Sequence, residues 1–308
     1  MKQLDEFRIY YNHTIHPELL RMERKRIRLL RLLFFSAIFV TTTLILGLVI
    51  DLLVVSLFMM IPIGFYTTFL LYRMRQFVLT FKPRIMNLIL DFIDNSINYG
   101  TLKYDAKKFI PNTTFKASKL FETPAPYYKG EDYITGSIGS LDFELCELEV
   151  KEYSPVRNRL NYVFKGVFLR AEFNAPITGQ VVVWPRAFRQ YLIKTIKAFT
   201  WEHGSDASME ILNEEFLEHF MVYATPHTHV VRLLTEDMQD AVLEYRKKID
   251  KEIYLSILDN KIYIAVTEPK DILEPNIFIS NLSFELVRTF FEDIRVLLSI
   301  LEDFDKSH

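Results

Sequence analysis

Hydrophobic residues form one long run between Leu32 and Leu71, and Asp51 is the single charge among these forty residues. As one helix, the run would extend about 60 Å, roughly twice the thickness of the hydrocarbon core of a bilayer. Folded back at Asp51, it gives two stretches, 32–50 and 52–71, each close to the length that one membrane crossing needs. The pattern therefore predicts a transmembrane helical hairpin.

Asp51 has two interpretations. An ionisable group in the middle of a membrane usually marks a functional site. Its position between two stretches of crossing length instead favours a solvated residue at the apex of the hairpin. A hairpin that enters the bilayer without crossing it is the alternative, and charge counts do not distinguish the two.

Basic residues flank both outer ends of the apolar run, whereas the connection between the two stretches carries only Asp51. The positive-inside rule then places both ends of the hairpin, and both termini of the chain, on the cytoplasmic side of the membrane. The membrane-flanking basic residues are Arg24, Lys25, Arg28, Arg31, Arg73 and Arg75.

The pattern divides the chain into four segments. Residues 1–31 form a basic N-terminal cytosolic segment, and residues 32–71 form the hairpin. Residues 72–100 have the apolar spacing of a linker helix with a bend at Pro83. Residues 101–308 form a cytosolic domain.

Alternating patterns in the first half of this domain predict strands. They cover 133–138, 141–153, 161–173 and 180–184, and the simplest arrangement is an antiparallel sheet with short connections. In the second half, helical spacing predicts helices and a few more strands. The expected helices are 187–200, 213–220, 226–234, 236–249 and 282–304, and the expected strands are 210–212, 221–224, 253–258 and 262–266. The fold class is therefore α+β, with an antiparallel sheet and helices behind the N-terminal hairpin.

Composition restricts the functional class. The chain has 308 residues, 50% of them hydrophobic, and a formal net charge of −2. These values exclude a disordered chain, and they give no support for a nucleic-acid partner. The single cysteine, Cys146, excludes an internal disulfide and fits a reducing compartment.

Several sequence blocks resemble a known bacterial family. The blocks are Tyr127-Tyr-Lys-Gly-Glu-Asp-Tyr-Ile-Thr-Gly136, Phe143-Glu-Leu-Cys-Glu-Leu148, Phe164-Lys-Gly-Val-Phe168 and Glu215-Phe-Leu-Glu-His-Phe-Met-Val-Tyr-Ala224, followed by Leu233-Leu-Thr235 and the 253–266 hairpin. In this order they resemble the family called domain of unknown function 3137, over most of residues 110–280. The resemblance implies a multi-pass protein of the bacterial inner membrane, often encoded near LemA-type membrane proteins. It implies no activity and no catalytic residue.

The chain lacks the common phosphate-binding, nucleophile-elbow and zinc-protease motifs. Weak catalytic candidates are Glu131 and Asp132 in a charged turn, together with His227 and His229. His227 and His229 are the best metal-like cluster, and His203 could join them, but two histidines on a loop are usually only polar surface. His13 and His16 have no third ligand near them. We therefore expect no metal and no cofactor. Cys146 lies among apolar neighbours and is expected to face the core rather than to react.

Aromatic residues are abundant, with 26 Phe and 16 Tyr. Tyrosines around the first predicted hairpin are candidates for a protein interface, because Tyr is enriched in interface anchors. They are Tyr127, Tyr128, Tyr133 and Tyr153. The alternative is a Phe-rich core.

The leading hypothesis is a non-enzymatic, membrane-anchored protein that binds a protein partner, such as a LemA-type membrane protein. A membrane-surface enzyme and a lipid- or small-ligand-binding module are the alternatives.

Overall fold

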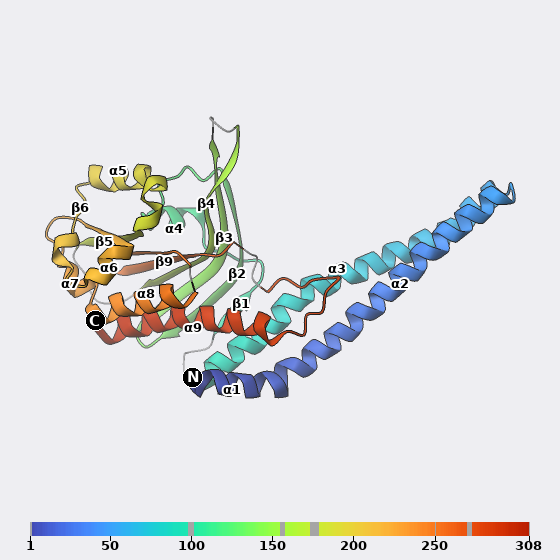
Figure 1. Cartoon of the computed structure of the whole chain (residues 1–308), viewed down its shortest axis with the longest axis horizontal. Helices are drawn as coiled ribbons and strands as arrows, with labels where there is room; N and C mark the ends of the chain where they lie inside the picture. Colours follow the sequence, from blue (N-terminus) through green and yellow to red (C-terminus); the bar gives the residue numbers. More distant parts are fainter. Residues whose placement is uncertain are drawn as a thin grey trace. The chain divides into compact units, whose positions relative to one another are not determined.

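The computed structural model of the chain describes residues 2–97, 102–154, 158–172, 179–249, 251–269 and 273–307 (Figure 1). The chain folds into two compact units. The first, the hairpin unit, consists of Met1–Phe92 and Ile272–Phe291. The second, the sheet unit, consists of Ile93–Asp271 and Glu292–His308. Together they confirm the predicted α+β fold class with two long apolar helices at its N-terminal end.

The hairpin unit is built from long helices. Helix α1 (Lys2–Tyr10) passes through a π-helical turn, η1 (Tyr11–Ile15), into α2 (His16–Val49), and α3 (Leu53–Ile97) follows. The reversal between α2 and α3 is tight and contains Asp51, whose φ of 56° lies in the left-handed region that Asp tolerates. The predicted hairpin apex at Asp51 is confirmed. Helix α3 continues through Pro62 and Pro83, so the expected linker helix and the second apolar stretch are one element.

Gly47 lets the two helices approach each other closely near the apex. A Cβ at this position would lie 2.1 Å from Oγ of Ser56 on α3, so any larger side chain would push the helices apart. Further from the apex, the hydroxyl groups of Ser36 and Thr67 share a hydrogen bond of 2.5 Å between the helices. Small and hydroxylated residues of this kind are typical of helix pairs in a membrane.

Side-chain exposure in the hairpin unit changes abruptly along both helices. Between Phe34 and Tyr72, 23 large hydrophobic side chains are exposed, Phe58 and Phe65 by 70% and 75%. Outside this range most of the described large hydrophobic residues of the unit are buried or partly buried; Leu29 on α2 and Met74 on α3 are among the buried ones. The exposed band coincides with the apolar run of the sequence.

The rest of the hairpin unit is a packed helical base. Phe7 of α1 stacks on Phe291 with ring centroids 3.9 Å apart, and the Tyr11 hydroxyl donates a 2.8 Å hydrogen bond to the backbone oxygen of Leu282. Arg26 is buried and donates to Glu23 and to the backbone oxygen of Ile277. The segment Ile272–Phe291, distant in sequence, therefore completes the core of this base.

The sheet unit contains one antiparallel sheet in which nine described strands follow the order β1-β2-β3-β4-β9-β8-β5-β7-β6 (Figure 1). The predicted 253–266 hairpin is confirmed as β8 and β9. The four strands predicted in the first half of the domain do form part of an antiparallel sheet, but they are not all neighbours in it. β5 does not pair with β4, because β9 and β8 lie between them. The strands are β1 (Lys103–Asp105), β2 (Tyr127–Ile138), β3 (Leu141–Ser154), β4 (Arg159–Glu172), β5 (Gln180–Pro185), β6 (Ser205–Asp206), β7 (Phe220–Ala224), β8 (Ile253–Leu258) and β9 (Lys261–Thr267).

Helices and short turns connect the strands, and most agree with expectation. The prediction of a strand at 210–212 is wrong, because the chain forms a 3₁₀ turn there that ends at Glu210. The helix expected at 226–234 is reduced to one turn, because Thr225–His229 form a hydrogen-bonded loop. The Asn213 side chain caps α6 by accepting from the N–H of Phe216. The elements are α4 (Asn112–Ala117), η2 (Arg186–Tyr191), α5 (Ile193–Trp201), η3 (Ser208–Glu210), α6 (Glu214–His219), α7 (Val230–Leu233), α8 (Glu236–Ile249) and α9 (Phe284–Ser307).

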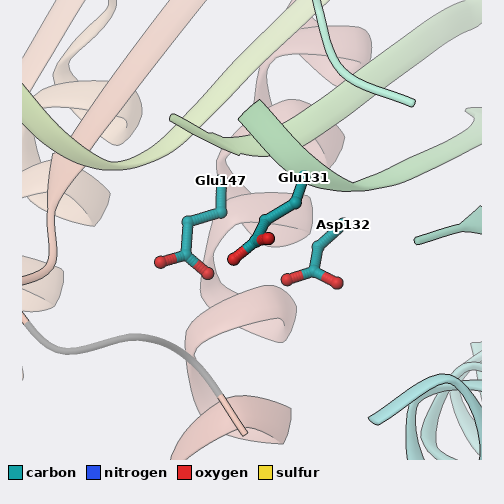
Figure 2. Close-up of side chains that lie close together, drawn as sticks. All are labelled: Glu131, Asp132 and Glu147. Atoms are coloured by element: carbon teal, nitrogen blue, oxygen red, sulfur yellow. The ribbon is translucent and has the colours of Figure 1, made fainter. Parts of the chain in front are cut away.

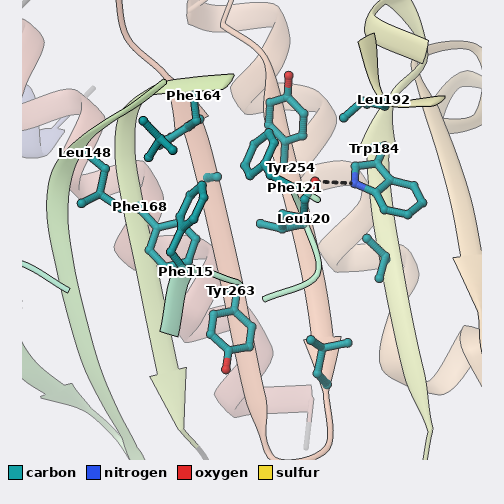
Figure 3. Close-up of a cluster of buried hydrophobic side chains, with 14 of the residues drawn as sticks. Phe115, Leu120, Phe121, Leu148, Phe164, Phe168, Trp184, Leu192, Tyr254 and Tyr263 are labelled. Carbon is teal, nitrogen blue, oxygen red and sulfur yellow. Dashed lines mark hydrogen bonds between the residues drawn. The ribbon is translucent and has the colours of Figure 1, made fainter. Parts of the chain in front are cut away.

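One face of the sheet carries an aromatic core (Figure 3). Phe115 of α4 is fully buried; it stacks on Phe121 with ring centroids 5.5 Å apart and lies 5.2 Å from the ring of Phe168. Trp184 donates from Nε1 to the backbone oxygen of Leu120 at 3.1 Å, which ties β5 to the same segment. Much of the Phe content is therefore explained by core packing.

We expect Phe115→Ala to lower the free energy of unfolding of the sheet unit by about 3–5 kcal/mol, because it leaves a cavity among four aromatic rings. Phe109→Ala is the matched control, since Phe109 is 43% exposed, and it should cost clearly less. Urea unfolding of the full chain in detergent, followed by Trp184 fluorescence in a Trp201→Phe background, measures both. Equal losses for the two variants would contradict the assigned core.

Candidate functional site

The hairpin of β3 and β4 extends beyond its neighbours in the sheet (Figure 1). The pairing of β2 with β3 reaches Lys151, and the pairing of β4 with β9 begins at Gly166. Beyond these points β3 and β4 pair with each other, from Lys151↔Tyr162 to Ser154↔Arg159. We call the residues Lys151–Ser154 and Arg159–Tyr162 the β3–β4 arm.

One face of this arm carries a group of aromatic and aliphatic side chains. Side chains alternate between the two faces of a strand, so residues two apart share a face. Lys151 and Tyr153 therefore lie on the same face as their cross-strand partners Tyr162 and Leu160, and as Tyr127, which pairs with Lys151 from β2. We call Tyr127, Lys151, Tyr153, Leu160 and Tyr162 the arm surface.

The arm surface is exposed and ordered by contacts around one lysine. Tyr153, Leu160 and Tyr162 are 49%, 45% and 59% exposed. The ammonium of Lys151 lies 4.8 Å from the ring centroid of Tyr127 and 4.5 Å from that of Tyr162. Cation–π contacts of this length hold both rings in place.

The charge of Lys151 is compensated locally. Its Nζ lies 2.6 Å from a carboxylate oxygen of Glu149, and this hydrogen bond lowers the pKa of Glu149 and raises the pKa of Lys151. The Tyr153 hydroxyl donates to Asn158 across the arm. The arm surface is therefore a preorganised aromatic patch with balanced charge, which is the composition of a protein interface.

The structure separates the four tyrosines that the sequence grouped as interface candidates. Tyr127 and Tyr153 belong to the arm surface, whereas Tyr128 and Tyr133 are half-buried on the opposite face of the sheet, against the aromatic core. The Tyr128 hydroxyl donates to the backbone oxygen of Ile110 and the Tyr133 hydroxyl to Glu144, both at 2.6 Å. Burial raises the pKa of both phenols.

A polar cavity of about 460 Å³ lies at the end of this core-bearing face of the sheet. Its central group is Arg170, which donates to Glu144 at 2.9 Å and also to Glu172. Asn260 donates a further hydrogen bond to Glu172 at 3.1 Å. Arg170, Glu144 and Glu172 already pair with one another, so this geometry selects no particular ligand. The lining is Lys103, Tyr133, Thr135, Gly136, Ser137, Asp142, Phe143, Glu144, Arg170 and Glu172.

Glu131 and Asp132 lie together with a third carboxylate, Glu147 of β3 (Figure 2). One oxygen of each lies within 4.8 Å of the others, and Asp132 and Glu147 are buried. The register of β2 on β3 shifts between Glu131 and Ile134, and Asp132 has a φ of 60°. This bulge turns Asp132 towards the pair that Glu131 and Glu147 form across the strands. Sequence reasoning missed Glu147, because only strand register brings it here.

An all-oxygen group of this kind suits Mg²⁺ or Ca²⁺ chemically. The group already has protein partners, however. The Tyr104 hydroxyl donates to Asp132 at 2.6 Å, and Nζ of Lys129 lies 3.7 Å from Glu131. These contacts involve Asp132 and Glu131, and they hold both side chains in place without an ion. Geometry alone therefore gives the trio no chemical assignment.

His227 and His229 lie far from these carboxylates. Both are exposed in the loop that follows β7, and His227 has a φ of 64°. β7 is five strands away from β3 in the sheet, which corresponds to about 24 Å at the usual strand spacing. The four weak catalytic candidates therefore do not form one site. His13 and His16 lie in the hairpin unit, at η1 and the start of α2.

Cys146 is fully buried, as expected of a core residue. Burial raises the pKa of its thiol to about 12, and the N–H of Ile110 donates to its Sγ at 3.3 Å. A thiol of this kind is almost entirely protonated at neutral pH and is a poor nucleophile.

The six membrane-flanking basic residues are all exposed on the hairpin unit, next to the exposed apolar band. Arg24, Lys25, Arg28 and Arg31 precede the band on α2, and Arg73 and Arg75 follow it on α3. Because the two helices run antiparallel, both groups lie at the same end of the band, away from Asp51.

Residues 162–306 match the family model described as protein of unknown function (DUF3137). The match confirms the resemblance to this family from Tyr162 onwards, where it covers most of β4 and the elements up to α9. The blocks at 127–136 and 143–148 lie outside the matched residues. No curated protein matches the chain. Among solved structures, the mycobacterial trehalose monomycolate transport factor A, TtfA, aligns with 10% identity and a TM-score of 0.30, over 66% of this chain and 90% of that one.

Proposed function

We propose that the protein is a membrane-anchored adaptor: the hairpin inserts in a bilayer, and the sheet unit binds a second protein through the arm surface. The observation that carries this proposal is the exposed, preorganised group of Tyr127, Tyr153, Leu160 and Tyr162 around Lys151.

The exposed apolar band has the dimensions of a bilayer. The part of α2 from Leu32 to Val49 is about 27 Å long, and the part of α3 from Leu53 to Leu71 is about 28 Å long, close to the ~30 Å hydrocarbon core. Both helices are long and apolar enough to cross a membrane. The basic residues at one end of the band favour a cytoplasmic location for the two termini and the sheet unit, in a bacterial inner membrane.

The arm surface fits a protein better than a small molecule. It lies on an arm that projects from the sheet (Figure 1), whereas small-ligand sites are concave. Its rings are held before a partner arrives, which lowers the entropic cost of binding. Tyrosine supplies apolar contact area and a hydroxyl together, as interface anchors require.

The expected partner is another protein of the same membrane, because an anchored domain meets its membrane neighbours most often. A LemA-type membrane protein is the first candidate to test. A membrane-surface enzyme is less favoured, because β2, which carries Glu131 and Asp132, is six strands away in the sheet from β7, which precedes the loop of His227 and His229.

We expect a photo-crosslinking amino acid at Tyr162 or Tyr153 to capture one reproducible partner protein in living cells, because both side chains are exposed on the arm surface. Mass spectrometry of the crosslinked species identifies the partner. Leu212 is the matched control, since it is hydrophobic, 80% exposed and outside the arm. Crosslinks of equal yield and identity at all three positions, or none above background at the arm, would contradict the proposal.

Orientation is tested by reporter fusions. We expect a reporter that is active only outside the cytoplasm to be active when fused after Asp51, because the apex lies on the far side of the membrane. A reporter active only in the cytoplasm should be active at the C-terminus. The same side for both fusions would show that the hairpin enters the bilayer without crossing it.

A further inference from the structure

The outward side of α5 has an unusual composition for the surface of a folded domain. Ile193, Lys197 and Trp201 are four residues apart, so they form one line along the helix. Ile193 is 50% exposed and Trp201 is 89% exposed, whereas Thr195 and Phe199 on the opposite side of the helix are buried. Tyr191, at the end of η2 just before the helix, is 74% exposed.

The same segment is strongly basic. Residues 186–201 contain Arg186, Arg189, Lys194 and Lys197 and no acidic residue, although the whole chain has a formal net charge of −2. Arg189 and Lys197 are both exposed. The stretch of η2 and α5 is thus locally basic, and α5 lies at the outside of the sheet unit (Figure 1).

The acidic residues that border α5 compensate only part of this charge. Glu152 of the β3–β4 arm pairs with Lys194 at 3.3 Å, and Glu202 pairs with Lys119 at 2.6 Å. Glu122 is exposed, and its backbone N–H donates to Thr195 on the inner side of α5. Lys197 remains on the outward side between Ile193 and Trp201.

From this arrangement we infer that the α5 surface, consisting of Tyr191, Ile193, Lys194, Lys197 and Trp201, docks on an anionic lipid bilayer. Basic side chains on a helix with Trp and an aliphatic residue beside them are the composition of helices that lie in a membrane interface. Trp and Tyr are enriched there because their rings have an apolar body and a polar edge. Lys and Arg stems contribute apolar area while their charges reach the headgroups.

Charge complementarity distinguishes this surface from the arm surface. On the arm, Lys151 is neutralised by Glu149, and the aromatic rings are tyrosines. On α5, Lys197 is available for an anionic partner, and the most exposed aromatic residue is a tryptophan. Glu152 lies on the face of the β3–β4 arm opposite to the arm surface, and it pairs with Lys194 of α5 there. The α5 surface therefore adjoins the other side of the arm from the arm surface.

This inference rests on the proposed anchor. A short helix with one Trp, one Tyr and one Ile is too small to hold a free protein on a membrane. When a hairpin already tethers the domain to the same bilayer, docking becomes an intramolecular step with a high effective concentration. A protein surface that binds lipid only weakly is then sufficient to fix the orientation of the sheet unit on the membrane.

The two tryptophans of the chain provide the test, because Trp184 is fully buried and Trp201 is exposed. The full chain is reconstituted in nanodiscs that contain phosphatidylcholine alone or an equal mixture with phosphatidylglycerol. Lipids with a nitroxide near the headgroup then quench the tryptophans that touch the bilayer. A Trp201→Phe variant gives the background from Trp184.

We expect lipid quenching of Trp201 in the anionic discs and much less in the neutral ones. Each basic charge at an anionic surface contributes about a fivefold factor, so Lys197→Glu should reduce the ratio of docked to undocked protein about 25-fold. Lys248→Glu is the matched control, since Lys248 is an exposed lysine on α8, and it should leave the quenching unchanged.

The inference would be overturned if, in anionic discs, Trp201 stayed accessible to aqueous iodide and was not quenched by the labelled lipid. That result would favour a protein partner for the α5 surface. Equal quenching in neutral and anionic discs would overturn the electrostatic assignment. Failure of the chain to co-purify with the discs would contradict the anchor itself, which separates failure of the proposed function from failure of this inference.

Discussion

The rest of the structure depends on the need to remove one band of apolar side chains from water. Twenty-three large hydrophobic side chains are exposed between Phe34 and Tyr72. At roughly 1 kcal/mol for each half-exposed side chain, the band would cost some 20 kcal/mol or more in water, beyond the net stability of a typical folded domain. A bilayer removes this cost, and the two helices satisfy their backbone hydrogen bonds internally, as a membrane requires.

The sheet unit divides its aromatic residues between stability and recognition. Phe115, Phe121 and Phe168 pack in the core, with Trp184 tied to the same segment. The β3–β4 arm leaves the sheet where β2 and β9 end, so its side chains have no core to enter and stay exposed. The arm surface and the α5 surface both carry exposed aromatic side chains, and we propose that these meet other molecules.

Sequence patterns predicted the elements that local physics determines. The apolar run, the turn at Asp51, the β8–β9 hairpin and the amphipathic helix at the C-terminus were all visible from spacing alone. Strand order was not, because β9 and β8 are inserted between β4 and β5 by pairing of distant segments. The candidate site was only partly visible, since the bulge after Glu131 reverses which face Tyr133 occupies and separates it from Tyr127.

The central claim is that the exposed band lies in lipid, and spin-label accessibility in proteoliposomes tests it most directly. Single cysteines replace Phe39, Phe58, Asp51 or Arg75 in a Cys146→Ala background, and each label is exposed to oxygen and to a water-soluble nickel chelate. We expect oxygen to relax the spin labels at Phe39 and Phe58 strongly and the nickel chelate to relax them little. The opposite order is expected for the labels at Asp51 and Arg75. Nickel access at all four positions would contradict the claim.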